Sequence, residues 1–256
     1  MPVDFKIEEH VAYVTLNRPD AMNSLDPDSV SQLTVIWSEV RENEDIRVAV
    51  LTGAGEKSFC TGTDMKKTPP PAECMASIWL RDGQPILPQM KMWKPIIAAI
   101  NGYCVGGGLE MTLACDIRIA STTAKFGLTE VKVASLAGLN GTQCLPRAIP
   151  RAVAMKMLLT GAMIDAQEAL RVGLVSDVVE PAELPGLAKK YADMIAANAP
   201  LSVKAAKQAA LMGLDMPLDH GIAFSHLLWG TLRDTEDRKE GFQAFSEKRT
   251  PQWRGR

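Results

Sequence analysis

Histidine is scarce in this 256-residue sequence, which contains only His10, His220 and His226. No known motif surrounds any of them: His10 falls in a charged turn, and the other two share one predicted helix. A Ser-His-Asp triad or a histidine-based zinc site would need at least one of the three. We therefore expect no metal site, and we assign acid–base chemistry to carboxylates, whose pKa values burial can raise.

Paired cysteines, a leader segment and long apolar runs are also missing. The five cysteines are odd in number, and no CxxC pair occurs among them, which favours buried thiols in a reducing compartment over disulfides or zinc. The first residues, MPVDFKIEEH, lack the basic-then-apolar order of a signal peptide. No run of about 18 apolar residues occurs, so no membrane span is predicted. These features predict a soluble cytoplasmic protein.

An excess of one charge is absent as well. Lysine and arginine total 28 against 30 aspartates and glutamates, a net charge of −2. Such a chain has no overall field that attracts nucleic acid or a membrane, although the tail EKRTPQWRGR forms a local basic stretch. With 46% hydrophobic residues, the chain is long enough for one sizeable core.

Short β-rich segments alternate with helical ones in the first part of the chain, and helices dominate after residue 151. A helix is predicted to begin after Asp26-Pro27, an N-cap followed by proline at the first helical position. This order indicates an α/β core with a helical C-terminal section. The predicted strands are 11–16, 47–52, 95–100, 117–120 and 174–179; the later predicted helices are 109–114, 152–159, 166–172, 182–197, 201–212, 218–232 and 236–248.

Residues 66–88 are rich in proline and glycine and have little periodicity. Long irregular segments inside compact domains are usually functional or disordered. Because this segment directly follows a candidate site, we interpret it as a mobile loop that covers the substrate.

The most informative stretch is NGYCVGGGLE, residues 101–110. A buried strand leads to three glycines, and a helix follows. Glycines leave room for a ligand, and N–H groups at a helix N-terminus favour negative charge, either a phosphate or the oxyanion of a reacting carbonyl. The P-loop and GxGxxG patterns do not fit. A tight strand–helix packing corner is the alternative interpretation.

Two glutamates follow these glycines within apolar sequence. Glu110 lies at the start of the helix, and Glu130 follows 20 residues later, beside the apolar stretch 131–137. Such a pair could perform acid–base chemistry. Alternatively, Glu110 is simply a charge that favours the helix start.

A second turn, SFCTGTDM at residues 58–65, follows the predicted strand 47–52. The N–H of Thr63 could converge with that of Gly107 on one oxygen and complete an oxyanion hole. The other reading is a loop in which Asp64 caps a neighbouring group.

Together these segments resemble the enoyl-CoA hydratase/isomerase (crotonase) superfamily over nearly the whole chain. The matching pieces occur in the family's order, and their combination is far more specific than any one of them. They are LNRP (16–19), NSL (23–25), FCTGTD (59–64), KPIIAAINGY (94–103), GGGLE (106–110), CD (115–116), FG (126–127), Glu130, GTQ (141–143), LTG (159–161), GLV (173–175) and FSEKR (245–249).

The resemblance implies an α/β fold, a spiral of repeated ββα units over residues 1–197. Residues 198–256 would then form a C-terminal helical region that builds a homotrimer, often paired into a hexamer. It also implies that the backbone N–H groups of Thr63 and Gly107 form the oxyanion hole for a thioester carbonyl. By the same analogy Glu110 activates water, and Glu130 delivers a proton to the α-carbon.

The substrate implied is an acyl-CoA thioester, with coenzyme A entering as part of the substrate and no permanently bound cofactor. Thr61, Met65 and Lys66 match positions around the adenine and phosphates, and Phe245 and Lys248 match tail positions that reach the nucleotide of a neighbouring subunit. The full set expected at coenzyme A is Met22, Thr61, Thr63, Asp64, Met65, Lys66, Gly106, Phe245 and Lys248.

The sequence departs from the common hydratase pattern at two places. Asp20 stands where lysine is frequent, so one phosphate contact is missing. Leu139 and Asn140 stand where many hydratases have alanine and glycine, which predicts a narrowed or more polar acyl pocket and puts straight-chain fatty acyl substrates in doubt.

The retained Glu110 favours hydration or dehydration over a Δ3-Δ2-enoyl-CoA isomerase, because isomerases of the family typically need only the glutamate that corresponds to Glu130. A non-catalytic RNA-binding relative is the alternative from another class. The balanced charge and the lack of interleaved basic and aromatic residues argue against RNA. The sequence therefore predicts an enoyl-CoA hydratase, with neither a nucleic acid nor a membrane as partner.

Overall fold

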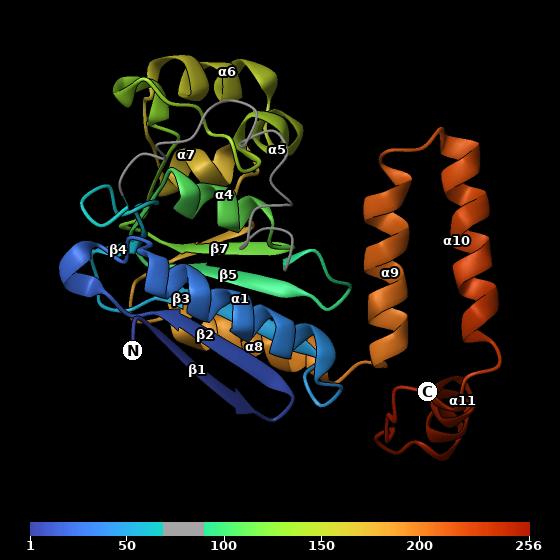
Figure 1. Cartoon of the computed structure of the whole chain (residues 1–256). Helices are drawn as coiled ribbons and strands as arrows, with labels where there is room; N and C mark the ends of the chain where they lie inside the picture. Colours follow the sequence, from blue (N-terminus) through green and yellow to red (C-terminus); the bar gives the residue numbers. More distant parts are fainter. Residues whose placement is uncertain (69–89) are drawn as a thin grey trace.

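The computed structural model of the chain describes residues 1–68 and 90–256 (Figure 1). The predicted covering loop, 66–88, lies outside the described residues except for its first three. In the part of the chain that is described, no helix combines the length and the apolar character needed to cross a bilayer.

Two sheets form the core of the molecule. The larger has the order β1-β2-β3-β5-β7-β10 and the smaller β4-β6-β8-β9. Neighbouring strands are parallel except for the pairs β1–β2 and β8–β9. The strands are β1 (Val3–Glu8), β2 (Val11–Leu16), β3 (Val48–Gly53), β4 (Ser58–Cys60), β5 (Ile96–Ile100), β6 (Tyr103–Val105), β7 (Ile117–Ser121), β8 (Lys125–Gly127), β9 (Ile164–Asp165) and β10 (Asp177–Val179).

The chain winds between these sheets as a spiral. It passes three times from a strand of the larger sheet to one of the smaller, in the pairs β3–β4, β5–β6 and β7–β8. Because β4, β6 and β8 lie side by side, the segments that follow them are brought to one edge of the smaller sheet. Two candidate segments, the turn after β4 and the glycines after β6, therefore become neighbours.

Helices cover both faces of the larger sheet (Figure 1). On one face lies α1 (Pro27–Glu42), which begins where the carboxylate of Asp26 accepts a 3.0 Å hydrogen bond from the Ser29 N–H. It buries Leu33, Trp37 and Val40 in the main core. On the other face, α8 (Leu184–Ala196) packs its alanines against β3, β5 and β7. The predicted N-cap of α1 is confirmed.

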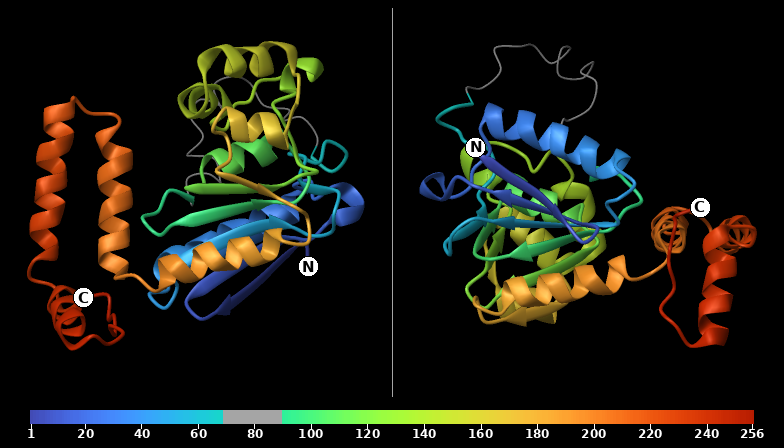
Figure 2. Two further views of the ribbon diagram at one scale, coloured as in Figure 1. Left: turned by 180° about the vertical axis from the view of Figure 1, so that it is seen from behind. Right: turned by 90° about the horizontal axis from the view of Figure 1, so that it is seen from below.

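The remaining helices divide into two groups. Those near the smaller sheet are α4 (Gly107–Leu113), α5 (Gly141–Ala148), α6 (Arg151–Thr160) and α7 (Ala166–Arg171). Beyond α8, the hairpin of α9 (Pro200–Gly213) and α10 (Leu218–Leu232) stands beside the core, with α11 (Glu236–Glu247) at its base (Figures 1 and 2). The hairpin keeps large apolar side chains exposed, among them Leu214 (83%), Leu218 (76%) and Leu227 (69%).

Most predicted elements are confirmed to within a few residues, and 11–16 and 218–232 match β2 and α10 in full. The strand predicted at 174–179 is shorter, covering only Asp177–Val179. One interpretation was wrong in detail: the strand before the three glycines is β6, which the sequence did not reveal, and the helix begins at Gly107 rather than 109. Strands of two or three residues have too few side chains to display a period.

Candidate active site

Glu110 lies in the first turn of α4 and is 2% exposed. Its Oε1 accepts hydrogen bonds from three successive backbone N–H groups, those of Leu139 (2.9 Å), Asn140 (2.9 Å) and Gly141 (2.8 Å). These residues lead into α5, so the carboxylate lies at the N-terminus of a second helix, a location that favours negative charge. No hydrogen bond within the described residues reaches Oε2, which leaves that oxygen for a ligand.

Glu130 begins the short 3-10 helix η2 (Glu130–Val133), directly after β8 and its connecting residues. A Cβ built on Gly106 would lie 3.2 Å from Glu130 Oε1, which puts this carboxyl beside the start of α4. Its Oε2 is buried and has no hydrogen-bond partner in the described part of the chain. Burial raises the pKa of Glu130, and the nearby charge of Glu110 adds to that rise.

Two of the three glycines, Gly106 and Gly108, are required by the local backbone. Gly106 has φ +57°, which side chains disfavour. A Cβ on Gly108 would lie only 2.2 Å from the carbonyl oxygen of Cys60, at the end of β4. Likewise, a Cβ on Gly62 would lie 2.9 Å from the Gly107 nitrogen. The glycines therefore form a tight packing corner at the candidate ligand site, because the backbone after β4 contacts the backbone after β6.

The turn that carries Thr63 is held by Leu25. The Leu25 N–H donates to the Gly62 carbonyl (2.8 Å), and the Asp64 N–H donates to the Leu25 carbonyl (2.9 Å). Because this parallel bridge uses the groups on either side of Thr63, the N–H of Thr63 faces away from Leu25. Within the described residues, neither this N–H nor that of Gly107 donates a hydrogen bond.

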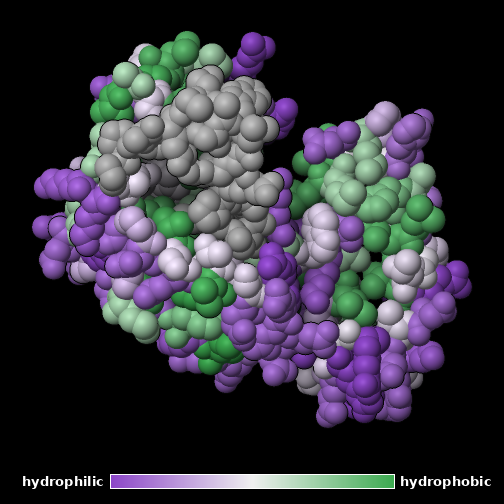
Figure 3. Space-filling model, in the orientation of Figure 1, coloured by the Kyte–Doolittle hydropathy of each residue, from purple (hydrophilic) through white to green (hydrophobic). Residues whose placement is uncertain are grey.

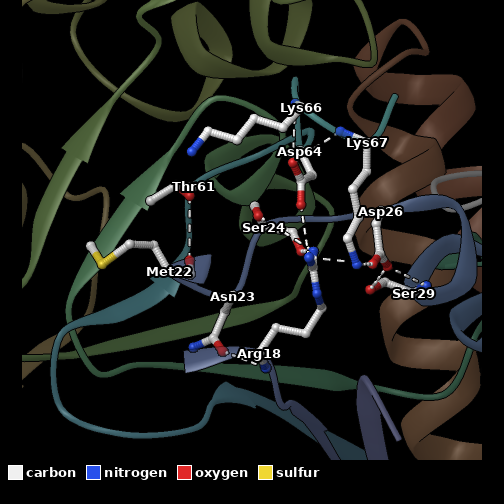
Figure 4. Close-up of polar contacts among 10 residues, drawn as sticks. All are labelled: Arg18, Met22, Asn23, Ser24, Asp26, Ser29, Thr61, Asp64, Lys66 and Lys67. Carbon is white, nitrogen blue, oxygen red and sulfur yellow. Dashed lines mark hydrogen bonds and ion pairs between the residues drawn. The ribbon is translucent and has the colours of Figure 1, made fainter. Parts of the chain in front are cut away.

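A cluster of charges surrounds the same turn (Figure 4). The Arg18 guanidinium lies 2.7 Å from Asp64 Oδ2 and 3.3 Å from Asp26 Oδ2, and Lys67 Nζ lies 2.9 Å from Asp26 Oδ2. The Arg18 hydrogen bond is the main cause that lowers the pKa of Asp64. Burial opposes ionisation of Asp26, but hydrogen bonds from Ser29 and Lys67 hold its pKa well below its usual range.

The sequence analysis gave Arg18 no role. Its place in the LNRP motif is the signal that could have identified it. Asp64 does act partly as the capping residue that was considered, since its Oδ1 accepts from the N–H groups of Lys66 (3.1 Å) and Lys67 (3.3 Å).

The residues predicted around coenzyme A fall into two places. Near the turn, the Thr61 hydroxyl donates to the Met22 carbonyl (3.3 Å), while Met65 (70% exposed) and Lys66 lie at the surface. Phe245 (87% exposed) and Lys248 belong to the end of α11, which lies apart from α4 in the same chain (Figures 1 and 2).

The side chains that other chemistries would use do not gather here. All three histidines are exposed, and two of them lie on α10. Burial raises the pKa of the Cys60 thiol to about 12, so this cysteine is not a thiolate nucleophile near neutral pH. Among the described residues, the carboxyl groups beside the glycines are those of the buried Glu110 and the half-buried Glu130.

The comparisons with known proteins agree with this geometry. The family model described as enoyl-CoA hydratase/isomerase matches residues 6–256. An (E)-benzylidenesuccinyl-CoA hydratase of Thauera aromatica is 77% identical, with both chains covered completely, and a short-chain-enoyl-CoA hydratase of Clostridium acetobutylicum is 40% identical over 94% of this chain and 93% of its own. The crystal structure of an enoyl-CoA hydratase from Bacillus anthracis is 37% identical and superposes with a TM-score of 0.91, both chains being covered completely.

The chain therefore belongs to the enoyl-CoA hydratase/isomerase family and has the crotonase fold. Within that family, its function is the hydration of an enoyl-CoA thioester, so the substrate carries coenzyme A.

Proposed function

We propose that Glu110 and Glu130 perform the proton transfers of hydration, while the N–H groups of Thr63 and Gly107 hold the thioester oxygen. Glu110 takes a proton from water through its Oε2, and the water oxygen bonds to the β-carbon of the double bond. The π electrons move to the thioester oxygen as an enolate. The enolate then collapses, and the α-carbon takes a proton from Glu130.

The unequal surroundings of the two carboxyl groups support this division. Glu110, with three N–H donors on Oε1, suits the carboxylate that acts as base. Glu130 has a buried oxygen without a partner and a raised pKa, which suits the acid that keeps its proton.

The observation that carries the proposal is the convergence at the start of α4. A Cβ on Gly62 would lie 2.9 Å from the Gly107 nitrogen, and a Cβ on Gly106 would lie 3.2 Å from Glu130 Oε1. Each N–H aimed at a developing oxyanion contributes roughly 3–4 kcal/mol to the transition state.

The test is the loss of enoyl thioester absorbance with purified wild type and with Glu110→Gln and Glu130→Gln. We expect hydration to fall at least about 1000-fold in each variant. Glu42→Gln, at a carboxyl 72% exposed, is the control and should keep wild-type activity. A folded Glu110→Gln protein that still hydrates its substrate at the wild-type rate would refute the assignment. If Glu110→Gln stops hydration but spares isomerisation of a 3-enoyl thioester, an isomerase activity coexists in the site.

We propose further that the acyl group is bulky and carries an aryl ring and a free carboxylate, as in (E)-benzylidenesuccinyl-CoA, the substrate named for the relative at 77% identity. The residues that depart from the common pattern support this. The Leu139 Cδ1 would lie 3.8 Å from a Cβ on Gly107, and Asn140 holds a buried amide oxygen without a partner in the described residues. Both border the carboxylate of Glu110.

A panel of crotonyl-CoA, cinnamoyl-CoA and (E)-benzylidenesuccinyl-CoA tests the acyl group. We expect kcat/KM to rise along this series by at least about 10-fold in total, a difference that pocket contacts readily supply. A preference for crotonyl-CoA would exclude the aryl dicarboxylic substrate while leaving the hydratase mechanism intact.

The proposed coenzyme A site has two parts. Met22, Thr61, Thr63, Met65, Lys66 and Gly106 would contact the nucleotide and pantetheine from this chain, and Asp64 would act by shaping the turn. Phe245 and Lys248 would reach the nucleotide bound to a neighbouring copy, which their distance from α4 within one chain makes necessary (Figure 1).

This second part requires an oligomer, and we propose a homotrimer or a dimer of trimers built by residues 198–256. Leu211, Leu214, Leu218, Ile222, Leu227 and Trp229 expose apolar surface on the hairpin, which a partner would cover. Some of this green surface is visible on α9 and α10 in Figure 3. Light scattering coupled to size exclusion should give a mass of three or six chains of 27.8 kDa. A monomer would refute the shared site.

We also propose that the enzyme works in the cytoplasm without a resident cofactor. The unpaired cysteines of the described residues support a reducing compartment. Cell fractionation should recover the activity with cytosolic markers, and dialysis against a chelator should leave kcat unchanged.

A further inference from the structure

The Arg18 side chain joins two segments that are far apart in sequence. Its Nη1 donates to the Ser24 carbonyl (2.5 Å), and its Nη2 donates to Asp64 Oδ2 (2.7 Å), 46 residues away (Figure 4). Ser24 directly precedes Leu25, and Asp64 directly follows Thr63. One planar guanidinium thus ties both sides of the bridge between Leu25 and the Thr63 turn.

The location makes these bonds strong. The side chain of Arg18 is 14% exposed, that of Asp64 11% and that of Asp26 5%. Hydrogen bonds between charged groups are stronger when solvent is excluded, and a guanidinium offers several donors in a fixed plane. Arg18 also lies between two carboxylates. Within the described residues, its removal would leave Asp26 paired with one cation, Lys67, whose side chain is 58% exposed, and would leave Asp64 without a cationic side chain.

Asn23 also holds the segment that carries Arg18; it is 1% exposed and has φ +54°. Its side chain accepts from the Arg18 N–H (2.9 Å) and donates to the carbonyls of Ala54 (3.0 Å) and Ser58 (2.8 Å). The backbone that carries Arg18 is therefore itself held against the strand that leads to the Thr63 turn. The backbone position from which the guanidinium extends is therefore fixed.

We propose that Arg18 is a positioning residue for the oxyanion hole: through Ser24 and Asp64 it fixes the direction of the Thr63 N–H. This inference rests on the proposed role of that N–H. The peptide that presents the Thr63 N–H is held on one side by the bond from the Leu25 N–H to the Gly62 carbonyl, which belongs to the same peptide group. Arg18 fixes the residues next to both ends of this contact, Ser24 before Leu25 and Asp64 after Thr63.

Kinetics of Arg18→Met provide the first test. Because Arg18 contacts no proposed substrate atom, we expect kcat to fall about 10- to 100-fold, the range caused by a misplacement near 1 Å, while KM changes by less than about 3-fold. The control is Arg47→Met. Arg47 also donates to two backbone carbonyls, those of Ala196 (2.8 Å) and Trp253 (3.2 Å), but it lies away from the turn. It should keep wild-type kcat.

A second measurement, by infrared spectroscopy, tests the oxyanion hole directly. Infrared spectra of bound 3-phenylpropionyl-CoA, isotope-labelled at the thioester carbonyl, measure how strongly N–H donors polarise that carbonyl without any reaction. The carbonyl band should move to lower frequency in wild type and in Arg47→Met. It should move less in Arg18→Met.

Two further variants guard against misfolding. Arg18→Lys keeps the charge, but a single ammonium cannot reach both Ser24 and Asp64, so it should show the same signature. Asp64→Asn weakens the pair from the other side and should do likewise. A folded Arg18 variant with wild-type kcat and carbonyl band would overturn the inference. A wild-type enzyme that binds the thioester without any band shift would instead overturn the proposed oxyanion hole.

Discussion

The two glutamates of the site lie in opposite environments. Glu110 is buried under a loop that aims three N–H groups at one of its oxygens, whereas Glu130 lies beside Gly106 and its buried Oε2 has no hydrogen-bond partner within the described residues. One carboxyl group is held by three backbone donors, and the other lacks such a set. The difference supports the opposite roles proposed for two chemically identical side chains, a base held by fixed donors and an acid whose pKa burial raises.

Among variants that leave both glutamates in place, the largest effect should come from closing the space beside Glu130. Gly106→Ala would place a Cβ 3.2 Å from Glu130 Oε1, at a backbone φ of +57° that alanine tolerates poorly. We expect kcat for hydration to fall at least about 100-fold and the free energy of unfolding to drop by about 1–3 kcal/mol. Gly186→Ala, in α8 with nothing within 4 Å of its added Cβ, is the matched control. Equal activity of the two variants in the absorbance assay would contradict the role of this space.

A methyl group added at Gly141 should displace the carboxylate of Glu110, because the N–H groups of residues 139–141 hold that carboxylate. A Cβ on Gly141 would lie 2.8 Å from Ala137 Cβ, 2.9 Å from Leu128 Cδ1 and 3.1 Å from Glu110 Oε1. We therefore expect Gly141→Ala to lower kcat about 10- to 100-fold through displacement of the carboxylate. Gly138→Ala adds the same atom to the same loop, where its nearest contact is an ordinary 3.6 Å to the Leu136 carbonyl. The kcat of Gly138→Ala should stay close to that of wild type. Similar losses of kcat in Gly138→Ala and Gly141→Ala would show that the effect is not specific to the contact with Glu110.

The pH dependence should report the proton that the pair shares. In the proposed mechanism, hydration starts with Glu110 as the base and Glu130 as the acid, and dehydration starts with these roles exchanged, so both directions require the same total of one proton. Since burial and Glu110 raise the pKa of Glu130, this proton is lost at a higher pH than an ordinary glutamate would lose it. We expect kcat/KM to decline as pH rises through that value, in parallel for both directions. If kcat/KM for hydration and kcat/KM for dehydration declined at different pH values, groups other than this pair would control the proton.

The smallest effect should follow the loss of the Asn140 side chain. Asn140→Gly keeps the N–H that donates to Glu110 and removes the amide whose oxygen is buried without a partner in the described residues. Hydration of crotonyl-CoA, which has no group for this amide to bind, should change by no more than about 3-fold, because the backbone and not the side chain holds the carboxylate. A loss as large as that of Gly141→Ala would show that the amide also orients the water.

Sequence patterns predicted the local features of this site well. Asp26-Pro27 starts α1, and a helix begins within the glycine run with Glu110 in its first turn, because capping, glycine conformation and apolar spacing depend on neighbouring residues. The roles given to Thr63, Gly107 and the coenzyme A residues came from the resemblance to a family and stay predictions. The short strands β4, β6 and β8 escaped prediction, since segments of three residues are stable only when paired with neighbours that lie far away in the chain.

The sequence by itself determined most of the helices to within a few residues, the central buried strands of the larger sheet and the family to which the chain belongs. Only the tertiary structure decided which backbone groups meet: the N–H groups of residues 139–141 at Glu110, Gly62 at Gly107, and Arg18 at Asp64. The physical reason is that these contacts join residues up to 46 positions apart, and they exist because the spiral stacks one turn of chain on the next. Local preferences carry no information about such stacking.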